Sequence, residues 1–134
     1  MKPLKQTVKA MVAAAREKIT EYSASEVISM FDQEDVVIVD IRDIRERQKL
    51  GFIPGSFHAP RGMLEFWIDP ESPYFKDIFS EEKRFILHCA SGWRSALSTA
   101  TLQDMGFEAV HIREGFNGWV DAGGPVAFPD KTPS

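Results

Sequence analysis

The sequence predicts one α/β domain in which a parallel sheet is covered by helices on both faces. Short apolar strands alternate along the chain with helical segments and are joined by a few residues, the order that places helices on a parallel sheet. The chain has 134 residues, 43% hydrophobic and 27% charged, the usual composition of one globular domain. Its single cysteine excludes an internal disulfide, CxxC redox chemistry and a cysteine-rich zinc site. The core must therefore form by packing alone.

Residues 1–19 predict an amphipathic helix that precedes the main domain. Apolar residues recur there with the spacing of one helix face: Leu4, Val8, Met11, Val12, Ala15 and Ile19. This stripe is rich in alanine and lacks a large aromatic anchor, which disfavours membrane binding. We expect it to pack on the domain or on a second copy of the chain, as in a homodimer.

Caps and a β-branched run predict the start of the domain. Ser23 and Glu26 have the spacing of a capping box, which predicts a helix over residues 24–31. Residues 36–39 (VVIV) are all β-branched, as in a strand buried on both faces. This strand is expected to end at Asp40.

A charged helix and a short strand are expected next. Residues 44–50 predict the helix, which Gly51 ends. The Pro54-Gly55 pair marks a turn, and residues 56–59 predict a short strand closed by Pro60.

Residues 61–80 are predicted to be the least regular part of the chain. They contain many large apolar side chains: Met63, Leu64, Phe66, Trp67, Tyr74, Phe75 and Phe79. We favour a roof over the core for these side chains, and the alternative is the wall of a pocket.

The remaining elements repeat the strand and helix alternation. A strand is predicted over residues 85–88 and a helix over 95–105, which Gly106 ends. A further strand at 109–112 and a short helix at 117–122 complete the domain.

Charge and hydropathy restrict the partners. The net charge is −4; residues 1–20 carry five basic residues against one acidic residue, so the rest of the chain has a charge of −8. This balance excludes nucleic acid as the main partner, since phosphate binding requires a basic face. No apolar run is long enough for a membrane span or a signal peptide, so we expect a cytoplasmic protein with a reduced thiol. We divide the chain into a helical extension (1–19), a domain (20–128) and a tail (129–134).

The chemistry is expected in the loop that follows the strand at 85–88. Ligand sites of open α/β sheets lie beyond the carboxyl ends of strands, and Cys89 lies at such a place. If the loop curls tightly, its amides bind an anion over the sulfur and favour the thiolate, the nucleophilic form. The cradle would consist of Ala90, Ser91, Gly92, Trp93, Arg94 and Ser95. The alternative is an unreactive cysteine that packs as a small hydrophobe.

Several other residues have two interpretations each. Arg94 either adds charge to the loop or ties it to a carboxylate, and Trp93 either gates the site or is a partner contact on the surface. For Asp40 and Arg42 we favour a structural ion pair below the loop over direct catalysis. Arg61 either collects an anion or, as we favour, is a solvated surface residue. No metal site or cofactor is expected, because the histidines lie on or beside three separate predicted strands: His58, His88 and His111.

Five segments of the chain together resemble the rhodanese-like sulfurtransferases. Residues 89–95 (CASGWRS) are similar to the CxxGxRS loop of that family, and residues 39–42 (VDIR) to its D-x-R strand end, with Glu46 in the following helix. Residues 51–56 (GFIPGS) resemble its GHIPGA turn. Residues 114–119 and 122–126 resemble its closing GGFxxW and AGxPV motifs. Five motifs in order are far more specific than one.

The resemblance implies a rhodanese-like fold of about five parallel strands and a sulfurtransferase activity. Cys89 would take sulfane sulfur from a small anionic donor such as thiosulfate and carry it as a persulfide. With one cysteine in the chain, the acceptor must be external: cyanide, a small thiol or another protein. Phe52 and Glu114 depart from the family motifs, and we expect them to change only local packing.

Two other functions are considered. Cysteine phosphatases and arsenate reductases of the CX5R type place five residues between cysteine and arginine, whereas four residues separate Cys89 from Arg94. The narrower loop disfavours a tetrahedral oxyanion. A non-catalytic rhodanese-like module would bind or regulate a partner, and the retention of Cys89 disfavours that function.

Overall fold

One parallel sheet organises the computed structural model, which describes residues 1–129. Its strands are β1 (Glu21–Tyr22), β2 (Val36–Asp40), β3 (Phe57–His58), β4 (Arg84–His88) and β5 (Val110–Ile112). Their order across the sheet is β1-β5-β4-β2-β3, with every neighbouring pair parallel. The predicted α/β class and parallel sheet are confirmed. Of the predicted tail, residues 130–134 lie outside the described residues.

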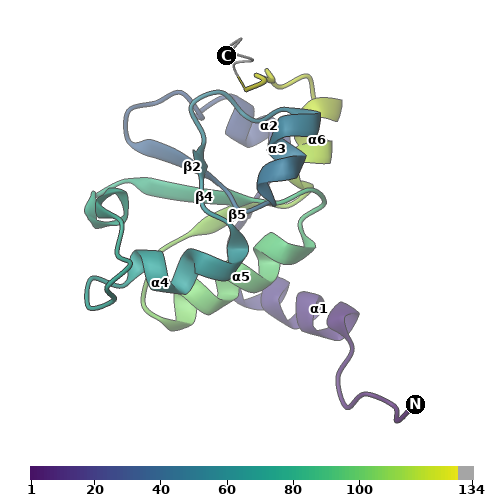
Figure 1. Ribbon diagram of the computed structural model, residues 1–134. Helices are drawn as coiled ribbons and strands as arrows, with labels where there is room; N and C mark the ends of the chain where they lie inside the picture. Colours follow the sequence, from purple (N-terminus) through teal and green to yellow (C-terminus); the bar gives the residue numbers. More distant parts are fainter. Residues whose placement is uncertain (130–134) are drawn as a thin grey trace.

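Helices cover both faces of the sheet (Figure 1). The helices are α1 (Val8–Lys18), α2 (Ala24–Ile28), α3 (Ile44–Leu50), α4 (Leu64–Ile68), α5 (Trp93–Asp104) and α6 (Gly115–Asp121). Figure 1 shows α1, α4 and α5 on one side of the sheet and α2, α3 and α6 on the other. Two short 3-10 turns, η1 (Arg61–Met63) and η2 (Asp77–Ser80), flank α4 and the loop after it.

The sheet separates two hydrophobic cores. Because successive side chains of a strand point to opposite faces, Ile38 and Val39 of β2 enter different cores. The core on the α4 and α5 side includes Val39, Ile41, Leu64, Phe79, Leu87, Cys89 and Leu102. The core on the α2 and α6 side includes Val27, Ile38, Ile86, Ile112, Phe116 and Trp119. The β-branched run of β2 is thus buried on both faces, as its composition predicts.

Side-chain caps begin the two short helices before and after β2. Ser23 and Glu26 form the predicted capping box at α2, each side chain accepting the backbone N–H of the other residue at 3.1 Å. The helix ends at Ile28 rather than at residue 31, because a series of turns follows. Asp43 and Glu46 form a second capping box at α3, and Gly51, with φ 84°, ends that helix.

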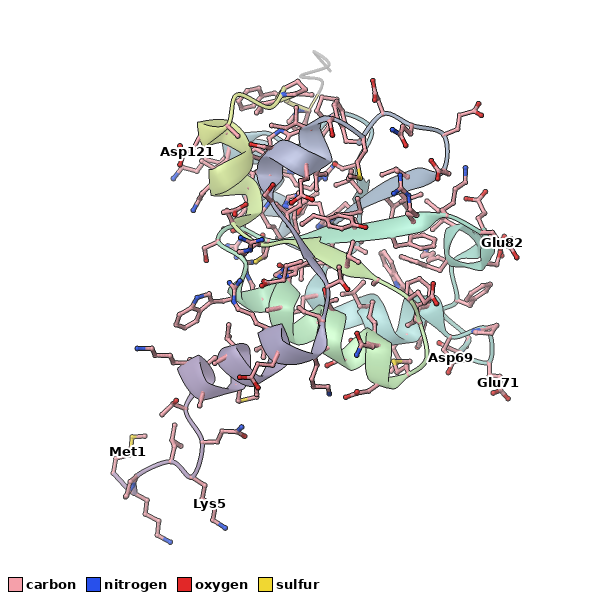
Figure 2. All side chains as sticks on the ribbon, turned by 180° about the vertical axis from the view of Figure 1, so that it is seen from behind. Met1, Lys5, Asp69, Glu71, Glu82 and Asp121 are labelled. Atoms are coloured by element: carbon pink, nitrogen blue, oxygen red, sulfur yellow. The ribbon has the colours of Figure 1, made fainter. Side chains whose placement is uncertain are left out.

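The N-terminal helix is shorter than its apolar stripe suggests and packs on α5. Thr7 caps it, so Leu4 lies outside the helix. Only Val12 and Ala15 of the stripe are buried, against Ala96 and Ala100 of α5. Leu4, Val8 and Met11 are exposed. Figure 2 shows Met1 and Lys5 extending away from the rest of the chain, on the side opposite to Asp69, Glu71 and Glu82.

Residues 61–80 form a roof over one core and contain a helix that the sequence did not predict. Helix α4 buries Leu64 and Ile68, and its Trp67 packs edge to face with Phe57 of β3 at a centroid distance of 6.1 Å. Phe79 packs in the same way on Phe57, at 5.7 Å. These contacts confirm the roof for Leu64, Trp67 and Phe79, whereas Phe66 and Tyr74 are exposed and do not cover the core. The expectation of an irregular segment was wrong for α4.

Strand β1 was not predicted, and two helices begin at other residues than predicted. The two residues of β1 become a strand only by pairing with β5, since they carry no apolar run of their own. Helices α5 and α6 begin two residues earlier than predicted, at Trp93 and Gly115. Within residues 1–129, no helix has the length and apolar character needed to span a membrane.

Candidate active site

The loop between β4 and α5 places its backbone around the sulfur of Cys89. The sulfur is buried, with the residue 1% exposed, and lies at the carboxyl end of β4 as predicted. The N–H of Gly92 points to Sγ at 3.1 Å, and the N–H of Ser95 at 3.4 Å. The Ser95 hydroxyl lies 3.5 Å from Sγ. Because these amides belong to the first turn of α5 and its cap, the sulfur faces the positive end of a helix.

The remaining loop residues lie outside this inner shell. Ala90 is half-buried and its carbonyl accepts the N–H of Asn117 at 3.0 Å. Ser91 and Trp93 are exposed, Trp93 by 45%. Both interpretations of Trp93, as a gate and as a partner contact, require this exposure. The structure thus brings Gly92 and Ser95 to the sulfur and leaves Ser91 and Trp93 at the surface.

Two glycines lock this loop against the start of α6. Gly92 has φ 98°, and a Cβ there would collide with the carbonyl oxygen of Arg113. Gly115 has φ 66°, and a Cβ there would collide with the carbonyl of Ala90. The N–H of Phe116 donates to the Cys89 carbonyl at 2.8 Å. The curl around the sulfur is therefore held from outside by the segment between β5 and α6.

Arg94 ties the loop to helix α3. Its two terminal nitrogens each donate to one carboxylate oxygen of Glu46 at 2.9 Å, a bidentate pair. This hydrogen bonding lowers the pKa of Glu46 against the opposing effect of burial. Of the two interpretations of Arg94, the structure shows the tie to a carboxylate. Glu46 is the main cause of the raised pKa of Arg94 and Cys89 contributes to it, so the guanidinium also adds positive charge near the sulfur.

Asp40 and Arg42 form the expected ion pair below the loop. Both side chains are fully buried, and Arg42 donates to the two oxygens of Asp40 at 3.0 and 2.9 Å. Arg47 adds a further hydrogen bond to Asp40 at 2.9 Å, and the Arg42 guanidinium stacks on Phe116 at 4.1 Å. Burial raises the pKa of Asp40, but neighbouring His88 and Arg42 outweigh it and lower that pKa to about 2. The pair connects β2 to both α3 and α6.

A series of hydrogen bonds behind Ser95 was not predicted from the sequence. The Ser95 hydroxyl lies 2.7 Å from Nδ1 of His111, and Nε2 of His111 lies 2.8 Å from Glu21. Arg16 of α1 binds the same Glu21 oxygen. Glu21 meets His111 through the pairing of β1 with β5. Since β1 has no strand signature, the sequence held no sign that these residues meet.

The other predicted polar residues have separate surroundings. His58 is bonded to the carbonyl of Arg42 at 2.7 Å, and His88 to the carbonyl of Cys89 at 3.0 Å. Arg61 is exposed and lines a shallow groove along α1 and α5. Among residues 1–129, no group of three or more histidine, cysteine, aspartate or glutamate side chains has the geometry to hold a metal ion.

The chain is similar to known proteins of one domain family. A family model of the rhodanese-like domain matches residues 23–122. The thiosulfate sulfurtransferase GlpE of Glaesserella parasuis is 29% identical over 111 residues, which cover 82% of this chain and 94% of that protein. The mouse thiosulfate sulfurtransferase/rhodanese-like domain-containing protein 3 is 28% identical over 101 residues, which cover 71% of this chain and 64% of the mouse protein.

Two further similarities carry phosphatase names. The dual specificity phosphatase Cdc25 of Arabidopsis thaliana is 28% identical over 137 residues, which cover 95% of this chain and 90% of that protein. A solved structure from Rhodopseudomonas palustris is 49% identical with a TM-score of 0.91, and the match covers 95% of this chain and 98% of that one. That protein is described as one of unknown function and a possible tyrosine phosphatase.

Proposed function

The chain belongs to the rhodanese-like domain family, and we propose that it is a sulfurtransferase that carries sulfane sulfur as a persulfide on Cys89. The observation that carries this proposal is the pair of amides, from Gly92 and Ser95, that donate to Sγ at the start of α5. Hydrogen-bond donors aimed at the sulfur favour its thiolate, the form that attacks a sulfur donor.

The proposed reaction has two displacement steps. The Cys89 thiolate attacks the outer sulfur of thiosulfate, a sulfur–sulfur bond forms on Sγ, and sulfite leaves with the electron pair of the broken bond. A nucleophile then attacks the outer sulfur and leaves the thiolate on Cys89. In both steps negative charge shifts along the sulfur atoms over the loop, where preorganised amides stabilise it.

The same loop suits a small anionic donor. Arg94 is half-buried and paired with Glu46, so it holds the loop in shape more than it adds free positive charge. The amides and the end of α5 then supply the attraction for the anion. Because the chain has one cysteine, the sulfur must pass to cyanide, a small thiol or a protein thiol. A persulfide chemistry needs a reduced thiol, so we place the protein in the cytoplasm.

Phosphatase activity is the second candidate, since two similar proteins carry that name. Two features of this chain disfavour it. Four residues separate Cys89 from Arg94, one fewer than in the CX5R loop. In addition, the Arg94 fork is already occupied by Glu46, whereas an oxyanion would need that fork.

Turnover on two substrates tests the proposal. With thiosulfate and cyanide, the wild-type protein is expected to form thiocyanate, and Cys89→Ser to stay at the level of the buffer. Neither protein is expected to hydrolyse an aryl phosphate. Hydrolysis of the aryl phosphate without thiocyanate formation would favour the phosphatase. No turnover of any sulfane donor would favour a module that only binds a partner.

A further inference from the structure

A continuous chain of hydrogen bonds leads from the Cys89 sulfur to the far edge of the sheet. It runs from Sγ to the Ser95 hydroxyl at 3.5 Å, then to Nδ1 of His111 at 2.7 Å. From Nε2 of His111 it continues to Glu21 at 2.8 Å. Ser95 and His111 are fully buried. Each of the four residues comes from a different place in the fold: the end of β4, α5, β5 and β1. This series of hydrogen bonds therefore depends on the whole fold.

The partners fix the direction of each hydrogen bond. The Glu21 carboxylate, which also binds Arg16, can only accept, so Nε2 of His111 donates to it. In a neutral imidazole Nδ1 must then accept, and it accepts the hydroxyl proton of Ser95. The Ser95 oxygen therefore turns its lone pairs to Sγ and accepts the thiol proton of Cys89. Each donor in the chain points away from the sulfur.

We propose that Ser95, His111 and Glu21 form a proton relay that takes the thiol proton of Cys89. The S–H bond breaks as its proton passes to the Ser95 oxygen, while the Ser95 proton passes to Nδ1 of His111. The products are the thiolate and an imidazolium held against Glu21, and no other reactant is needed. The Ser95 hydroxyl then donates to the thiolate. The inference rests on the proposed function, in which the thiolate is the attacking form.

The surroundings of His111 keep its imidazole neutral, the form that has a free lone pair to take a proton. Burial lowers the pKa of His111, the hydrogen bond and charge of Glu21 raise it, and Arg16 and Arg113 lower it, with a lowered pKa as the result. These charged groups come from β1, α1 and the turn after β5, and Cys89 reaches the ring through Ser95. The imidazole is therefore neutral beside the resting thiol. Proton transfer from the thiol creates a thiolate and an imidazolium, and Glu21 stabilises the imidazolium.

Of the three relay residues, only Ser95 touches the sulfur; His111 and Glu21 are positioning residues that act through it. The relay also gives the N-terminal helix a role, because Arg16 of α1 holds Glu21 from the outside. A purely structural role for His111 would need only a hydrogen-bond acceptor for the Ser95 hydroxyl. A relay needs a group that can take the proton. Glutamine meets the first requirement and not the second.

The test is the pH dependence of Cys89 alkylation by iodoacetamide, followed by intact mass without any sulfur donor. His111→Gln and Ser95→Ala are expected to move the alkylation profile to higher pH and to lower the alkylation rate near pH 7 about 10-fold. Glu21→Gln is expected to move it in the same direction. His58→Gln, a control at a histidine bonded to the Arg42 carbonyl, is expected to keep the wild-type profile.

Circular dichroism checks that each variant is folded. A folded His111→Gln protein whose profile coincides with that of the wild type would overturn the relay and leave a structural hydrogen bond. Because the readout is alkylation, this outcome is independent of sulfur transfer. If the wild-type protein forms thiocyanate but the His111→Gln profile is unshifted, the relay alone is contradicted. If the His111→Gln profile is shifted but the wild-type protein takes up no sulfur, the proposed function alone is contradicted.

Discussion

Replacement of Gly92 by alanine is expected to lower the rate constant of sulfur loading from thiosulfate by about 100-fold, the usual cost of losing a preorganised amide donor. Gly92 has φ 98°, where a side chain is strained, and a Cβ would collide with the Arg113 carbonyl. The loop must move to relieve this collision, and the N–H that points to Sγ at 3.1 Å moves with it. The rate is measured by intact mass against time.

Gly106→Ala is the matched control for backbone strain. Gly106 has φ 89° at the far end of α5, and a Cβ there meets nothing within 4 Å. This variant is expected to lose some stability and to load sulfur at the wild-type rate. Equal loading by a folded Gly92→Ala protein would show that the amide of Gly92 does not act on the sulfur.

Replacement of Asp40 by alanine is expected to lower the free energy of unfolding by about 3–5 kcal/mol, the cost of leaving a buried charge without its partner. Arg42 is fully buried and would keep only the Gly51 carbonyl, at 2.7 Å, as an acceptor. Arg47 would lose the same carboxylate. Urea unfolding at neutral pH measures the change.

The pH dependence of this effect follows from the lowered pKa of Asp40. That pKa is about 2 in the folded chain against an ordinary value of 3.8, so the carboxylate stabilises the fold above pH 3.8. The stabilisation is lost as the pH falls towards 2. The difference between wild type and Asp40→Ala is therefore expected to shrink over this range.

Two further variants test whether the loss of stability in Asp40→Ala arises because the ion pair is buried. Asp104→Ala removes an exposed partner of Lys18 and is expected to change stability far less than Asp40→Ala. The double variant Asp40→Asn with Arg42→Met removes both buried charges and is expected to be less destabilised than the sum of its single variants. A loss of stability in Asp40→Ala no greater than in Asp104→Ala would contradict the account.

Those elements that carry local signals could be predicted from the sequence. The β-branched run of β2 and the capping box of Ser23 and Glu26 are local patterns. Strand β2 forms as predicted, and helix α2 begins as predicted but ends three residues early. The position of Cys89 between a strand and a helix start also follows from local patterns. Helix α4 was missed because its five residues are too few for helical periodicity to show, and packing of Leu64 and Ile68 stabilises it.

The parts of the site that escaped prediction depend on contacts between distant residues. Glu21 and His111 are 90 residues apart and meet only because β1 pairs with β5. Arg94 forms an ion pair because Glu46, which lies 48 residues away in the sequence on α3, is brought next to it by the fold. In both cases the residue types were visible in the sequence, and the partner was set by tertiary structure.

Intact mass after incubation with thiosulfate tests most directly whether Cys89 carries sulfur. The wild-type protein is expected to gain the mass of one sulfur atom, which cyanide or a thiol reductant removes. Cys89→Ser, treated in the same way, is expected to keep its original mass. A folded wild-type protein that gains no sulfur from thiosulfate or any other sulfane donor, or a Cys89→Ser protein that gains as much as the wild type, would contradict the persulfide on Cys89.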